Sequence, residues 1–212
     1  MLPPWLVYTC LVMYAAGVLA ALRTAPWSAL RDPTIQNLAL GCSVCLIALW
    51  RMKAGLQPGL AFHFLAVTTV TLMLGWSLAV ITTFAAELSL TLMVGEPVVG
   101  VGVDGILTGL LPASLTYLLY GLYERRLPQH LFVYIFAVAF LGGATVAVVT
   151  VFARATLLTL VGAYSLDRLS SEYLPFLPLY AFPEAVLNGM LVTVLSVYRP
   201  GWMKTLNENA TV

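Results

Sequence analysis

A small set of ionisable side chains lies within or at the edge of long apolar stretches, where charged groups are costly and need an explanation. His63, Glu87, Asp104, Arg154 and Glu184 form this set. A neutral imidazole is the commonest transition-metal ligand, and carboxylates from other helices can complete its coordination shell or orient the ring. The residue types therefore indicate a metal site with His63, Asp104, Glu184 and Glu87 as candidate ligands and Arg154 as a charge partner.

Each of these residues also has a structural explanation. Asp104 could cap a helix, because it follows Gly102-Val103 and precedes an apolar run. Glu184 follows Pro183, a favoured first helical residue, and an acid there suits the helix dipole. Arg154 could neutralise Glu87 or Asp104, and His63 could bond to a neighbouring helix. With one His, side chains alone would hold nickel or zinc weakly, so backbone nitrogens, water or a chelated substrate would have to contribute.

The elements that position these residues must be membrane helices. Of the 212 residues, 61% are apolar and 9% are charged, against roughly 25% charged in soluble domains. The net charge of +1 gives no basic field for nucleic acid. We expect an all-α polytopic membrane bundle in a single domain, 1–212, surrounded by lipid. About seven transmembrane helices are predicted, the third short or re-entrant, over Pro4–Leu22, Thr34–Trp50, Leu60–Leu74, Ser77–Val94, Asp104–Tyr123, His130–Ala163 and Phe182–Tyr198.

The basic residues in the loops predict the orientation. With seven crossings and the N-terminus outside, the inner segments hold six Lys and Arg residues and the outer segments hold three. This count favours a multi-pass protein of the inner (plasma) membrane with a cytoplasmic C-terminus. In that topology His63, Glu87, Glu96, Asp104, Arg154 and Glu184 all fall in the outer half. A polar cavity open to the outside explains them jointly.

Further segments have less specific signals. Proline spacing in the outer loop Tyr164–Ala181 argues against a regular helix. Gly105, Gly109 and Ala113 recur every four residues, a pattern typical of close helix packing. Arg125 and Arg126 are topology anchors or a docking patch for a partner.

The chain lacks the motifs of common enzymes. It contains no G-x-x-x-x-G-K-[ST], no H-E-x-x-H and no G-x-S-x-G, so we expect no ATP hydrolysis and no enzymatic activity. No covalently bound cofactor is expected. Cys42 and Cys45 have C-x-x-C spacing in mid-helix, with Cys10 at a similar depth. They are small buried apolar residues or, alternatively, a copper(I) site.

Three stretches resemble the CbiM-like family of substrate-capturing membrane subunits of energy-coupling factor importers. The first is Gly59-Leu-Ala-Phe-His63 with Thr68-Thr69 and Leu72-Met-Leu-Gly75. The second is Gly102-Val-Asp-Gly105, which opens a span. The third is Phe182-Pro-Glu-Ala-Val-Leu-Asn-Gly189. The likeness extends over most of the chain and is closest to a compact subgroup of predicted permeases.

The resemblance implies import of a transition-metal ion, cobalt or nickel, with separate coupling and ATPase subunits as partners. It also implies that His63 is the interior imidazole ligand. Family members add a second-position His, whereas this chain begins Met1-Leu2-Pro3. Carboxylates such as Glu87, Asp104 or Glu184 would then complete the site. The alternative function is a membrane accessory protein that assists assembly of a partner complex or delivers copper to it.

Overall fold

Six long apolar helical spans make up most of the chain in the computed structural model, which describes residues 3–55 and 60–209. Each span is long and apolar enough to cross a bilayer. The expectation of a polytopic, all-helical membrane bundle is confirmed. The six spans are Pro4–Thr24, Pro33–Arg51, Trp76–Val94, Val98–Arg126, Leu131–Leu160 and Leu166–Tyr198.

Three of the spans are single helices, and the later three are composite. The single helices are α1 (Pro4–Thr24), α2 (Pro33–Arg51) and α4 (Trp76–Val94). The composite spans are η2 (Val98–Gly100), α5 (Val101–Gly105), η3 (Ile106–Leu110) and α6 (Leu111–Arg126); then α7 (Leu131–Val133), η4 (Tyr134–Leu141) and α8 (Gly142–Leu160); then α9 (Leu166–Glu172), η5 (Leu174–Phe176) and α10 (Leu177–Tyr198). Of these segments, η3 and η4 are π-helical. Shorter pieces are η1 (Ala29–Arg31), η6 (Pro200–Trp202) and α11 (Lys204–Asn209).

Helix α3 (Val67–Leu74) is much shorter than the six spans. It has eight residues, and every one of them is buried. An α-helix of that length rises about 12 Å, less than half of a bilayer core of roughly 30 Å. A small antiparallel hairpin of β1 (Ala54–Gly55) and β2 (Ala61–Phe62) precedes it, and residues 63–66 lead from β2 into α3 without helical structure. Only the second half of the predicted third span, Leu60–Leu74, is therefore helical.

The non-helical residues and α3 together make a seventh pass through the bundle. The hairpin follows the end of α2, whereas the next helix, α4, starts where α1 ends. There, Thr24 Oγ1 and Ser77 Oγ lie 2.8 Å apart and share a hydrogen bond. The chain has thus changed ends between Arg51 and Ser77. The expectation of about seven passes with a short third one is confirmed.

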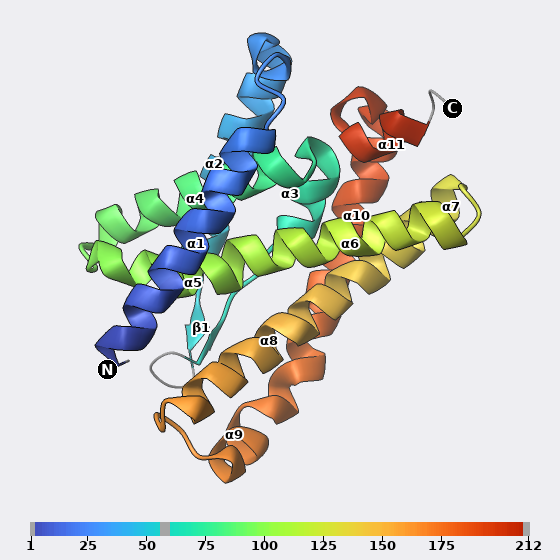
Figure 1. Ribbon diagram of the computed structural model, residues 1–212. Coiled ribbons are helices and arrows are strands. Elements are labelled where there is room, and N and C mark those ends of the chain that lie inside the picture. The colour runs from blue at the N-terminus through green and yellow to red at the C-terminus, as the bar shows by residue number, and fades with distance from the viewer. Residues whose placement is uncertain (1–2, 56–59, 210–212) are drawn as a thin grey trace.

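The bundle has two ends that carry different elements (Figure 1). We call the end with β1, β2 and the start of α1 the hairpin end. We call the opposite end, with the α1–α2 connection and α11, the α11 end. The chain begins at the first and finishes at the second, as the predicted topology requires. That the hairpin end faces outside stays a prediction.

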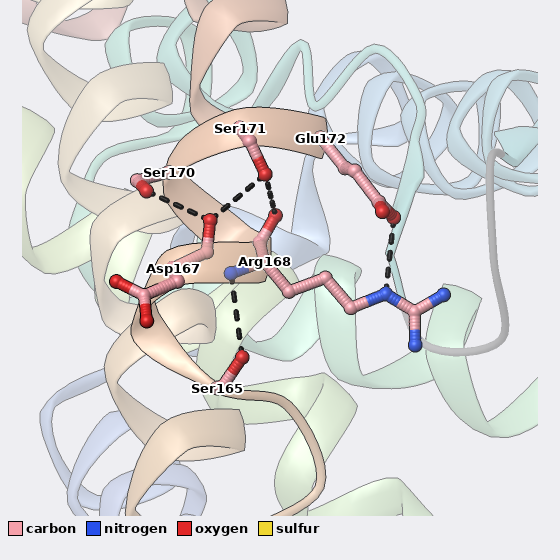
Figure 2. Close-up of polar contacts among 6 residues, drawn as sticks. All are labelled: Ser165, Asp167, Arg168, Ser170, Ser171 and Glu172. Atoms are coloured by element: carbon pink, nitrogen blue, oxygen red, sulfur yellow. Dashed lines mark hydrogen bonds and ion pairs between the residues drawn. The ribbon is translucent and has the colours of Figure 1, made fainter.

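The segment Tyr164–Ala181, expected to lack regular helix, is largely helical, so that expectation is wrong. Ser165 caps α9 by accepting the Arg168 backbone N–H at 3.3 Å, and Arg168 pairs with Glu172 one turn later (Figure 2). The prolines do not break these helices, because Pro175 and Pro178 occupy first turns, where no N–H is needed.

Two acids expected to open helices lie inside them instead. Asp104 is within the helical run that begins at Val98, directly after the extended Pro97, and its side chain caps nothing. Glu184 is inside α10, because Pro178 takes the first turn and Pro183 is an interior residue of the helix. The predictions of an N-cap and of a first-turn acid are therefore wrong.

The small residues of the span Val98–Arg126 pack closely, as predicted. A Cβ added to Gly102 would lie 2.5 Å from the backbone of Leu11 in α1. One added to Gly109 would lie 2.8 Å from Thr83 Oγ1 of α4, and Ala113 has no exposed surface. Because Gly102 and Gly109 have no side chains, α1 and α4 approach the backbone of this span directly.

Replacing Gly102 should therefore destabilise the bundle. We expect Gly102→Ala to lower the free energy of unfolding by about 1–3 kcal/mol, because the backbone of α1 must move away. The measurement is thermal unfolding of the purified protein in one detergent. Gly41→Ala in α2 is the control, since nothing lies within 4 Å of its added Cβ and alanine favours helix. Equal losses in both variants would contradict the close approach.

Candidate functional site

A polar cavity of about 250 Å³ lies at the hairpin end of the bundle. It collects side chains from the hairpin region, α4, the α4–α5 connection, α5 and α8. Four of the five predicted site residues line it, and Glu96 and Lys53 join them. The charged and imidazole side chains of its lining are Lys53, His63, Glu87, Glu96, Asp104 and Arg154.

His63 is held from three sides. Its ring centroid lies 6.1 Å from that of Trp50, and its Nδ1 lies 3.4 Å from the carbonyl oxygen of Phe64. The hydroxyl of Tyr180 in α10 donates to the His63 carbonyl at 3.1 Å. A proton on Nδ1 would face the Phe64 carbonyl and leave the lone pair on Nε2, the arrangement that metal-binding histidines commonly show.

Arg154 pairs with Asp104 across the cavity wall. Its Nη2 lies 3.2 Å from Asp104 Oδ1, and the Arg154 side chain is 16% exposed whereas that of Asp104 is 44% exposed. Of the two partners considered from the sequence, Asp104 is the one in contact. The pair places one carboxylate and one guanidinium in the cavity lining.

Glu87 lies deeper, in the middle of α4, and is buried. The Thr108 hydroxyl donates to the Asp104 carbonyl oxygen at 2.7 Å and lies 3.4 Å from Glu87 Oε2. Thr108 belongs to the π-helical η3, whose wider turn redirects side chains within a helix. Neither Thr108 nor Glu96 was among the predicted ligands.

Glu184 is not part of this cavity lining. Its Oε2 accepts the Leu65 backbone N–H at 2.9 Å, and its Oε1 accepts those of Ala66 at 2.8 Å and of the Asn188 side chain at 2.8 Å. Asn188 Oδ1 in turn accepts the backbone N–H of Thr69 at 2.9 Å. The two residues therefore hold the non-helical segment and the start of α3.

These contacts, which we call the Glu184–Asn188 bracket, were not predicted from the sequence, although a signal was available. Glu184 and Asn188 are four residues apart, so they share one face of a helix. A buried acid and amide on one face indicate a polar partner without helical hydrogen bonds of its own. The missing information was which segment supplies that partner.

The remaining candidates lie elsewhere. Cys10 is buried in α1, whereas Cys42 is half-buried and Cys45 is exposed on α2, and all three are free thiols. Arg125 and Arg126 are exposed at the end of α6, toward the α11 end. Within residues 3–55 and 60–209, no three His, Cys, Asp or Glu side chains come close enough to form a metal site by themselves.

A second cavity, of about 390 Å³, lies at the α11 end. It is lined mainly by apolar residues of η1, α2, α3 and α4, with Lys204 of α11 at its edge. None of the predicted ligands lies there. The hairpin-end cavity is therefore the candidate for polar chemistry, since it combines an imidazole, three carboxylates and two cations.

Neutralising Glu184 should loosen the segment that carries His63. Glu184→Gln replaces an acceptor oxygen by a donor, so a buried N–H of Leu65 or Ala66 loses its partner, at about 1–3 kcal/mol. We expect faster deuterium exchange over residues 60–70 and a lower melting temperature. Glu172→Gln is the control, because that carboxylate is 49% exposed and pairs only at the surface of α9. Unchanged exchange in Glu184→Gln would contradict the bracket.

Comparison with protein-family models agrees with the resemblance noted from the motifs. Neither the curated proteins nor the solved structures gave a match. The family model described as the cobalt uptake substrate-specific transmembrane region, CbiM, matches residues 1–202. That match covers all seven passes and stops just before α11. The chain therefore belongs to the CbiM family.

Proposed function

We propose that this protein is the substrate-capturing membrane subunit of an energy-coupling factor type importer for a divalent transition metal such as cobalt or nickel. The convergence of His63 with Glu87, Glu96 and Asp104 in one cavity carries the proposal. Imidazole and carboxylate together suit a divalent transition metal. Membership of a family described by cobalt uptake supports the same substrate class.

In this proposal the carboxylates attract the cation and His63 supplies a nitrogen ligand through Nε2. Arg154 positions Asp104, and Glu87 adds negative charge from the α4 side of the cavity lining. Glu184 contributes indirectly, by fixing the segment on which His63 lies. Water or a chelating molecule completes the coordination, because side chains of the described residues do not.

The proposal leaves ATP hydrolysis to separate subunits. The α11 end, where Arg125 and Arg126 are exposed, is the proposed docking surface for the coupling subunit. Residues 63–66 together with helix α3 connect the two ends physically. The helix starts at the Glu184–Asn188 bracket, and its Leu72 carbonyl accepts the Thr205 hydroxyl of α11 at 2.9 Å.

Metal binding by the purified protein tests this function. Titration with nickel, cobalt, zinc and copper(II) in detergent should show saturable binding of nickel or cobalt, with one ion per chain. We expect His63→Ala to weaken it at least about tenfold, since a ligand is lost. His130→Ala is the matched control, because His130 caps α7 at the opposite end. Absent binding of the metal in every form, free or chelated, or equal effects of both variants, would contradict the proposal.

Docking at the α11 end makes a separate prediction. Reversing both charges with Arg125→Glu and Arg126→Glu should abolish ATP-dependent metal accumulation in cells that also express the ATPase and coupling subunits. Metal binding by the purified variant should stay within about twofold of the unchanged protein, because the cavity lies at the other end. Loss of binding together with uptake would show that the arginines act on the fold instead of on a partner.

A further inference from the structure

We propose that the metal enters the hairpin-end cavity already bound by a small chelator bearing carboxylates, and not as the bare hydrated ion. This inference rests on the proposed function and adds the chemical form of the cargo. It follows from the cations that face the cavity, from its incomplete ligand set and from an unsatisfied hydroxyl beside it.

Two cations share the cavity with the acids. Lys53 and Arg154 line it together with Glu87, Glu96 and Asp104. A bare dication is attracted by the carboxylates but repelled by both cations, and like charges brought together in a binding site are unfavourable. A carboxylate-bearing complex is attracted by both groups of side chains. Its metal faces the acids and His63, and its carboxylates face Lys53 and Arg154.

Arg154 lines the cavity while it is paired with Asp104. Its Nη2 lies 3.2 Å from Asp104 Oδ1. Charge-assisted bonds from guanidinium and ammonium groups to carboxylates are among the stronger polar contacts in proteins. The same two side chains that disfavour a bare ion therefore favour its carboxylate complex.

The ligand set also requires a contribution from the cargo. His63 is the one imidazole of the cavity lining, and the described residues bring no three metal-binding side chains together. Divalent transition metals bind four to six donor atoms. A chelator that fills part of the coordination sphere leaves a vacant position for His63 Nε2. The cavity volume of about 250 Å³ lies just below the range for drug-sized ligands, which suits a compact complex.

A smaller cavity of about 20 Å³ continues from the same wall. It shares His63, Thr108 and Arg154 with the larger cavity, and Thr150 of α8 also lines it. Thr150 Oγ1 is buried and has no hydrogen-bond partner among the described residues. A buried hydroxyl in this state indicates a polar guest, and the volume holds one water or one ligand oxygen. The polar site thus extends past His63 toward α8.

Two nickel complexes of equal denticity test the inference. Iminodiacetate and diethylenetriamine both bind nickel through three donors, but the first ends in two carboxylates and the second in two amines. Isothermal titration of the purified protein in detergent would compare these two complexes with nickel chloride. We expect the iminodiacetate complex to bind at least about tenfold more tightly than either, the gain typical of a charge-assisted hydrogen bond.

Lys53→Met tests whether the Lys53 ammonium group causes the preference for the carboxylate complex. We expect it to remove most of the preference for the iminodiacetate complex and to tighten nickel chloride binding, because the cation that repels the bare ion is gone. Lys53 is exposed between the end of α2 and the start of β1, so the fold should tolerate the change. Lys204→Met is the matched control, because that lysine lines the cavity at the α11 end. It should retain the full preference.

Each other result overturns a defined part of the argument. Equal or tighter binding of nickel chloride overturns the chelate and leaves the proposed function intact. Equal binding of the triamine complex overturns recognition of carboxylates. Binding of metal-free iminodiacetate as tight as that of its nickel complex overturns the role of the metal. Failure to bind nickel in any form overturns the proposed function itself.

Discussion

The architecture depends on the hydrogen bonds that one carboxylate and one amide make to a piece of chain without helical structure. Inside a bilayer every backbone polar group needs a partner within the protein, and a non-helical segment cannot supply its own. Glu184 accepts the N–H groups of Leu65 and Ala66, and Trp50 donates to the Leu65 carbonyl at 3.2 Å. Ala66 adopts a left-handed conformation, with φ of 53°, which a non-glycine residue maintains only when its surroundings fix it. These bonds fix the segment that carries His63, and so they fix one side of the cavity.

From that segment the organisation extends in both directions. Toward the hairpin end it presents His63 to a cavity whose walls come from α4, α5 and α8. Toward the α11 end it continues into α3, all of whose residues are buried. There, the Thr205 hydroxyl donates to the Leu72 carbonyl in the last turn of α3. The Tyr134 hydroxyl oxygen lies 2.7 Å from that of Thr205. The non-helical segment and this buried helix together contact both ends, so a change at one end can reach the other, whereas the long spans around them face lipid.

Much of this arrangement could be predicted from the sequence, and the failures have two causes. Apolar runs of sufficient length identified the spans, and the clustering of ionisable residues at one end predicted the cavity that now contains His63, Glu87 and Asp104. Local rules failed where a proline allowed two interpretations, at Pro178 and Pro183. They also could not identify Leu65 and Ala66 as the partners of Glu184, because the residues that bond lie 118 and 119 positions apart in the chain. Contacts at that separation are set by the packing of the whole bundle.

That separation also affects how the protein is made. The third pass leaves the ribosome long before α10, so when it reaches the translocon its exposed backbone has no carboxylate to bond. A segment with unsatisfied amides is a poor candidate for release into lipid on its own. Stable insertion of the third pass therefore depends on α10, whose Glu184 is synthesised 119 residues after Leu65 and 118 residues after Ala66.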